Sequence, residues 1–99
     1  MKLFIEHLVS SLGLATLKRL CVKKSLKTSG VKAAVVERLS IAFESEAGEL
    51  LSLLNKVELQ QVCAKSTWEE GEELYCLDDK GPKATLLQRI IEFGEDEFN

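Results

Sequence analysis

The sequence predicts an all-α fold made of two tandem helical repeats, and three observations lead to this prediction. The chain has 99 residues, which is enough for one compact domain or two very small ones. It holds one proline and six glycines, whereas Leu, Ala, Glu and Lys, which favour helices, are abundant. Its apolar residues recur at helical spacing, and its two halves are similar to each other.

Composition excludes several classes of protein. Hydrophobic residues make up 45% and charged residues 29% of the chain, which is typical of a globular protein and not of a disordered one. The length excludes most enzyme barrels and doubly wound sheets. No apolar stretch approaches the ~20 residues needed to cross a bilayer, and residues 1–12 do not resemble a signal peptide. We therefore expect an intracellular protein of the cytoplasm, nucleoid or nucleus, with no membrane contact.

The internal repeat becomes visible at two different shifts. A shift of 42 residues aligns residues 7–24 with 49–66, with six of 18 positions identical. A shift of 51 aligns residues 26–39 with 77–90, with five of 14 identical. The nine-residue difference is an insertion within residues 66–76 of the second copy. We expect repeats at residues 1–45 and 46–99 that pack on a shared core.

The sequence of each copy predicts two helices, then a loop, then a third helix. Apolar spacing predicts a first helix near residues 2–12 and a second near residues 14–24, with a third beginning near Gly30. In the second copy, Asn55 and Glu58 have the spacing of a capping box, which predicts that a helix begins there. Pro82 fits the first turn of the last helix, where a missing N–H costs little.

Charge is divided unevenly between the copies. Residues 16–39 hold seven basic residues and one acidic residue, a net charge of +6, whereas residues 56–92 hold five basic and eight acidic residues, a net charge of −3. Since screening limits what a partner senses to about 10 Å, the first copy should attract polyanions although the whole chain carries −3. The alternative is that this lysine-rich face only solubilises the protein.

The positions of the basic residues favour the first interpretation. The stretch Lys27-Thr28-Ser29-Gly30 with Lys32 lies where the third helix is predicted to begin. Unpaired amides and the helix dipole favour a phosphate at such a point, and glycine lets it approach the backbone. Lysines and amides carry little base information, so binding should be salt-sensitive and weakly sequence-specific.

The first copy is similar to a known family over residues 17–39. The residues that carry the similarity are Leu17, Leu20, Cys21, Leu26, Ser29, Gly30, Val31, Lys32, Ala33, Val35, Val36, Arg38 and Leu39. They resemble the SAP motif, a short helix–loop–helix DNA-binding family. The resemblance implies two SAP-like three-helix repeats, the second divergent, and DNA contact through the loop and the start of the following helix, mainly by the backbone.

The predicted DNA-binding residues follow from this resemblance and from the charge. They are Lys23, Lys24, Lys27, Thr28, Ser29, Gly30 and Lys32. Lys80, Gly81 and Lys83 form a possible second site, although Asp78 and Asp79 replace the first copy's Lys27 and Thr28. Because SAP modules are usually attached to nucleases, repair proteins or chromatin factors, the chain is also compatible with a targeting domain of a larger DNA-processing enzyme that continues after residue 99.

Catalysis and metal binding find little support in the sequence. His7 and the three cysteines could form a Cys3His zinc site, but no Cys-x-x-Cys pair is present, and Cys21 and Cys63 occupy matching apolar positions. Core packing is the favoured interpretation. Asp78, Asp79 and the nearby lysines lack the strand framework of a nuclease site. We expect no enzyme activity, no metal and no cofactor.

The insertion in the second copy carries the only tryptophan and the only tyrosine of the chain, Trp68 and Tyr75, among acidic residues. One interpretation is a loop whose aromatic rings cap the core. The other is a protein-binding patch, because exposed Trp and Tyr often anchor interfaces. A protein-interaction module, using this insertion and the basic face, is therefore the alternative to a DNA-binding module.

Overall fold

The computed structural model describes residues 2–98, and this part of the chain is mostly helical with one small antiparallel sheet. It forms two compact units, Met1–Leu53 and Leu54–Asn99, which are described separately below. None of the helices within residues 2–98 has the length and apolarity that a membrane-spanning helix requires.

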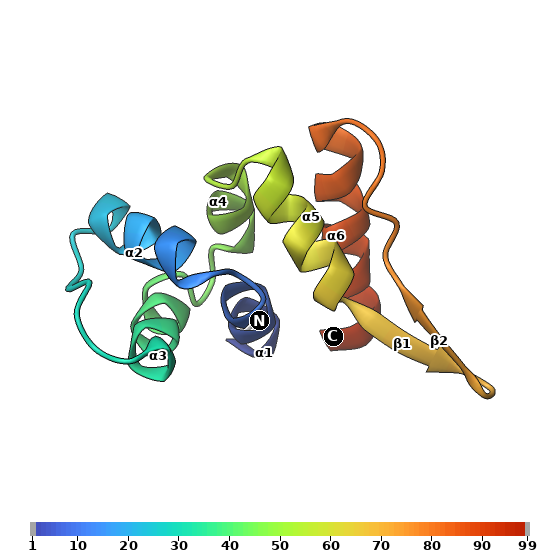
Figure 1. The fold of residues 1–99 in the computed structure, drawn as a ribbon, viewed down its shortest axis with the longest axis horizontal. Helices are drawn as coiled ribbons and strands as arrows, with labels where there is room; N and C mark the ends of the chain where they lie inside the picture. Colours follow the sequence, from blue (N-terminus) through green and yellow to red (C-terminus); the bar gives the residue numbers. More distant parts are fainter. Residues whose placement is uncertain (1, 99) are drawn as a thin grey trace. The chain divides into compact units, whose positions relative to one another are not determined.

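The first unit consists of four helices, coloured blue to green in Figure 1. They are α1 (Lys2–Ser10), α2 (Leu14–Lys23), α3 (Lys32–Ala42) and α4 (Ala47–Ser52). Helices α1 and α2 both pack on α3. Because the apolar residues of these helices recur at helical spacing, they face one another and form a core. This core includes Ile5, Leu8, Leu17, Leu20, Val35, Leu39 and Phe43, all fully buried.

Helix α4 lies in the first unit, although its sequence matches the end of α1 and the repeat predicts it in the second copy. The unit boundary therefore falls between Leu53 and Leu54, eight residues beyond the one expected from sequence. Two side chains, from α2 and from its C-cap, contact this segment: Arg19 donates a hydrogen bond to the carbonyl of Leu53 (3.1 Å), and Lys24 forms ion pairs with Glu46 and Glu49.

The second unit contains α5 (Lys56–Lys65), β1 (Thr67–Glu70), β2 (Glu73–Cys76) and α6 (Lys83–Phe98). Helix α5 packs on α6, and β2 lies beside α5. The predicted capping box is confirmed: the Asn55 side chain accepts from the Glu58 amide, and the Glu58 carboxylate accepts from the Asn55 amide, each at 2.9 Å. Leu59, Val62, Cys63, Leu86 and Ile90 are fully buried.

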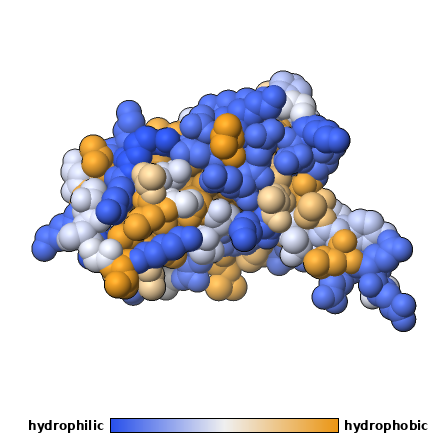
Figure 2. Space-filling model, in the orientation of Figure 1, coloured by the Kyte–Doolittle hydropathy of each residue, from blue (hydrophilic) through white to orange (hydrophobic). Residues whose placement is uncertain are grey.

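The expectation of a loop at residues 66–76 is wrong, because this insertion forms a β-hairpin. Strands β1 and β2 pair with Trp68 opposite Tyr75 and Glu70 opposite Glu73. Gly71, with φ of 63°, occupies the first of the two connecting positions, where a type II′ hairpin turn favours glycine. In Figure 1 the hairpin extends away from α5 and α6, and in Figure 2 its tip is hydrophilic.

The acidic residues Glu95, Asp96 and Glu97 are exposed on the last turns of α6, which continues to Phe98. The Phe98 ring packs edge-on against Phe93, with 6.1 Å between centroids. Phe98 is half-buried at this contact.

Candidate nucleic-acid interface

The predicted binding loop begins where α2 ends in a Schellman motif. The amide of Leu26 donates to the carbonyl of Cys21 at 2.8 Å, and the amide of Ser25 donates to the carbonyl of Val22 at 3.1 Å. Ser25 has φ of 57°, the left-handed conformation that this motif requires. The chain therefore turns sharply after Lys24 and leaves residues 26–31 as an irregular loop, which we call the α2–α3 loop.

Arg38 of α3 forms hydrogen bonds with the backbone of this loop. The guanidinium of Arg38 donates to the carbonyl of Lys27 at 3.1 Å and to the carbonyl of Ser29 at 2.5 Å. Gly30 has φ of 110°, and a Cβ placed there would lie 3.2 Å from Arg38 Nη2. The positive φ therefore favours glycine at this position, and a larger residue would also displace the Arg38 guanidinium slightly.

The amides of the same segment are unused. Within residues 2–98, no backbone N–H from residue 28 to residue 33 donates a hydrogen bond, and Val31, the N-cap of α3, provides no side-chain cap. The first intrahelical donors are Ala34 and Val35, which both bond to the Val31 carbonyl. The start of α3 therefore presents free donors together with the positive end of the helix dipole.

Three of the predicted lysines are free to bind a ligand. Lys23, Lys27 and Lys32 are exposed, at the end of α2, in the α2–α3 loop and at the first residue of α3. None of them forms an ion pair with another described residue. Ser29 and Gly30 are also exposed, and Thr28 is half-buried.

Lys24 has a different role from its neighbours. Its ammonium group lies 3.1 Å from Glu46 and 3.2 Å from Glu49, and 4.7 Å from the centroid of the Phe43 ring. The hydrogen bonds to Glu46 and Glu49 raise the pKa of Lys24. This lysine connects α2 to the segment that contains α4, so its charge is already matched within the first unit.

The second unit repeats the arginine arrangement at the positions that the sequence alignment makes equivalent. Arg89 of α6 donates to the carbonyls of Asp78 and Lys80 in the β2–α6 loop, residues 77–82. Gly81 has φ of 116°, close to that of Gly30. The two loops therefore share one mode of support: an arginine from the following helix holds two alternate carbonyls, and a glycine with positive φ precedes the helix.

The chemistry presented by the β2–α6 loop is different. The Asp78 carboxylate accepts from the amide of Lys80 at 2.9 Å and lies 3.9 Å from the Arg89 guanidinium. Pro82 has no N–H to offer, and the carbonyl of Asp79 accepts from Gln60 at 3.0 Å. A carboxylate of the protein thus occupies part of the position where an anion would bind, although Lys80 and Lys83 themselves are exposed.

The two aromatic residues of the insertion face each other across the hairpin. The rings of Trp68 and Tyr75 stack with centroids 5.9 Å apart and an interplanar angle of 19°. Trp68 also lies against Phe93 of α6, with 6.4 Å between the ring centroids. Tyr75 is exposed and donates to Glu73, and this hydrogen bond raises the pKa of Tyr75. Trp68 therefore joins the hairpin to the helix, and Tyr75 lies on the outside.

Sequence reasoning did not assign a role to Arg38 or Arg89. The available signal was their identity in both copies, each eight residues after its glycine. Their contacts with loop carbonyls could not be read from the pattern. A pocket beside Trp68 on α6 was also missed, because the residues that line it are separated by the β2–α6 loop.

Comparisons with known proteins do not add a family to this geometry: a scan against family models, a search of curated proteins and a search of solved structures find no match.

Proposed function

We propose that the first unit is a non-catalytic DNA-binding module, in which the α2–α3 loop and the start of α3 contact the phosphates of duplex DNA. One observation carries the proposal: free backbone amides at residues 28–33 lie next to exposed lysines that have no acidic partner. Phosphate oxygens suit both kinds of donor. The contact residues are Lys23, Lys27, Thr28, Ser29, Gly30 and Lys32, and Lys24 is left out because its charge is matched.

Arg38 supports this interface without taking part in it. Because its guanidinium is occupied by the carbonyls of Lys27 and Ser29, it fixes the loop before DNA arrives. A loop that is already ordered loses less entropy on binding. Arg38 also keeps two carbonyls, which would repel phosphate, engaged with a cation.

We further propose that both units are SAP-like and that only the first binds DNA. The common support of the two loops favours a common origin. At the second loop the Lys80 amide already donates a hydrogen bond to the Asp78 carboxylate, and the surrounding residues carry net negative charge. Both features disfavour phosphate there. In the cell the module would direct the protein, or a larger DNA-processing protein of which it forms part, to DNA.

A titration with duplex DNA at several salt concentrations tests the proposal. Replacing Lys27 and Lys32 by Ala should weaken binding at every sequence and reduce the slope of log K against log salt by about two units. The matched control replaces Lys80 and Lys83 by Ala in the equivalent loop, which should leave both quantities unchanged. If the two double variants behave alike, the α2–α3 loop is not the contact surface.

A second variant tests the chemistry of the loop. Lys27→Asp introduces the residue that the second copy carries at the equivalent position. We expect it to weaken DNA binding more than Lys27→Ala, since the carboxylate both repels phosphate and can occupy the amide of Ser29. Equal affinities of the two variants would contradict the role assigned to the amides.

A further inference from the structure

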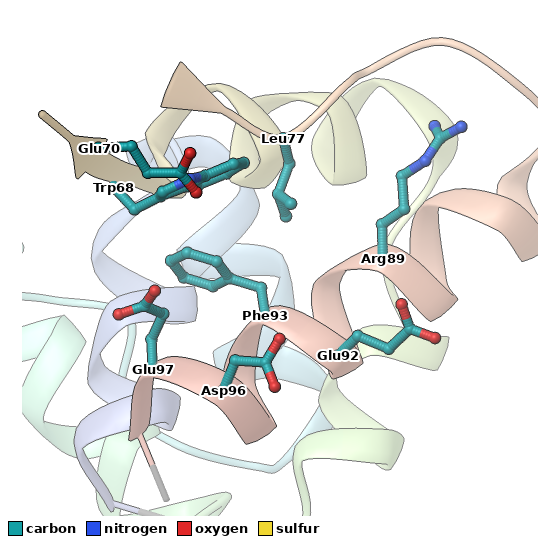
Figure 3. A pocket seen from close by; sticks show the side chains of 8 residues that line it. All are labelled: Trp68, Glu70, Leu77, Arg89, Glu92, Phe93, Asp96 and Glu97. Carbon is teal, nitrogen blue, oxygen red and sulfur yellow. The ribbon is translucent and has the colours of Figure 1, made fainter. Parts of the chain in front are cut away.

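The second unit contains a pocket whose lining differs in character from the DNA-binding loop. Its volume is about 360 Å³, and it is formed by β1, the residue after β2, and one side of α6. Figure 3 shows Trp68 and Leu77 on one side and Phe93 on α6 facing them. Binding sites for small ligands begin at roughly 300 Å³, so this pocket suits a single side chain better than a large molecule.

The aromatic wall of the pocket is held firmly in place. Trp68 stacks on Tyr75 from the neighbouring strand and contacts Phe93, which itself packs against Phe98. Phe93 is only 8% exposed, whereas Trp68 is half-buried. The indole therefore has a fixed position with part of its surface still accessible to a ligand.

Carboxylates surround this aromatic wall. Glu70, Glu92, Asp96 and Glu97 line the pocket and are exposed, and none of them forms an ion pair with another residue in the range 2–98. Figure 3 shows the carboxylates of Asp96 and Glu97 rising from α6 on the side of Phe93. The only cation of the lining, Arg89, is already bonded to the carbonyls of Asp78 and Lys80 and lies close to the Asp78 carboxylate.

We propose that this pocket binds an arginine side chain from a basic segment of a partner protein. A guanidinium stacks on an aromatic face and pairs with carboxylates in the same plane, and it loses its hydration more readily than an ammonium group. Its methylene stem would contact Leu77 and Phe93. Four carboxylates with no cationic partner provide the charge complementarity, and they exclude DNA as the occupant because phosphates would be repelled. The inference is independent of the function proposed for the first unit.

The single tryptophan of the chain gives a direct measurement of occupancy. The intact 99-residue protein is titrated with a Gly/Ser-rich peptide that carries two arginines, and the fluorescence of Trp68 is followed. The comparison peptide carries citrulline in place of each arginine, which keeps the shape and removes the charge. We expect a saturable change in fluorescence with the arginine peptide only.

Two charge-matched variants locate the binding site. Asp96→Asn with Glu97→Gln removes two carboxylates from the pocket and should weaken peptide binding about tenfold, the loss expected for charge-assisted hydrogen bonds. Glu69→Gln with Glu72→Gln removes the same charge from the hairpin outside the pocket lining and should leave affinity unchanged. Thermal unfolding by circular dichroism verifies that both variants are folded.

The proposal is overturned if the citrulline peptide binds as well as the arginine peptide, if the two double variants weaken binding equally, or if binding leaves Trp68 fluorescence unaltered. Titration of the same variants with duplex DNA keeps the two functions apart. Loss of peptide binding with normal DNA binding supports the pocket, and loss of DNA binding in the lysine variants leaves the peptide result unaffected.

Discussion

At the scale of single residues, the arginines that support the two loops decide the geometry of the candidate interface. Arg38 and Arg89 each hold two carbonyls separated by one residue. In each arginine a single nitrogen, Nη1, donates to both carbonyls, and a lysine would hold them less firmly because its ammonium is more strongly hydrated and lies on a more flexible stem. Replacing either arginine by lysine therefore keeps the positive charge and changes only how the two carbonyls are held.

We expect Arg38→Lys to lower the free energy of unfolding by about 1 kcal/mol, the net value of hydrogen bonds that are partly exposed, and to weaken DNA binding although net charge is unchanged. Chemical denaturation and DNA titration measure the two effects. Arg89→Lys is the matched control, and it should cost similar stability with no effect on DNA. Unaltered affinity in Arg38→Lys would mean that the loop needs no support to bind.

The cysteines differ in reactivity because of their surroundings. Cys21 and Cys63 are fully buried, as predicted from their matching apolar positions, whereas Cys76 is exposed on β2. Burial raises the pKa of Cys21, and it raises the pKa of Cys63 to about 11. Both thiols therefore stay protonated and inaccessible near neutral pH.

Alkylation of the native protein at about pH 8 should modify Cys76 alone, because it is exposed whereas Cys21 and Cys63 are buried. Cys21 and Cys63 should react only after denaturation. Mass spectrometry of peptides from native and unfolded samples distinguishes the three sites. Fast labelling of Cys63 in the native protein would show that α5 opens locally.

At the scale of elements, helix ends were the most predictable features. The residue types and spacing of Asn55 and Glu58 are enough to predict the start of α5, and the structure confirms both hydrogen bonds of the capping box. The expected first and second helices, residues 2–12 and 14–24, agree with α1 and α2 to within two residues, because apolar spacing depends only on local sequence.

Replacing the cap tests how much of this local signal contributes to stability. Asn55→Ala removes the acceptor of the Glu58 amide and should lower the free energy of unfolding by about 1 kcal/mol. Asn55→Ser keeps an N-cap oxygen and should recover most of the loss. Denaturant unfolding followed by circular dichroism gives both values, and equal stability of all three proteins would show that water replaces the cap.

The hairpin was missed because its composition argues against strands. Residues 69, 70, 72 and 73 are glutamates, which are depleted in β-sheets. The contrary signals were Thr67, Trp68 and Tyr75, which favour strands, and Gly71 at the turn. Packing of Trp68 against Phe93 of α6 is a tertiary contact that no local pattern contains. The pocket beside it was unpredictable for the same reason.

At the scale of the whole molecule, the alignment of the chain with itself was more informative than any motif. It placed Gly30 with Gly81 and Arg38 with Arg89, and the structure shows each pair in equivalent surroundings. It assigned the segment of α4 to the second copy, whereas this helix belongs to the first unit, where Lys24 forms ion pairs with Glu46 and Glu49. The separation of charge between the halves came from counting charged residues in each copy, and both proposed binding functions depend on it.

The arginine support has a consequence for how such a chain can change over time. The residue that shapes each loop comes from the following helix, while the residues that would meet a ligand belong to the loop itself. Side chains such as Lys27 or Asp78 can therefore be exchanged without loss of the scaffold beneath them. In a chain with two such loops, one or two substitutions in a loop can alter what it binds, while the arginine beneath keeps the loop folded as a surface for a different ligand.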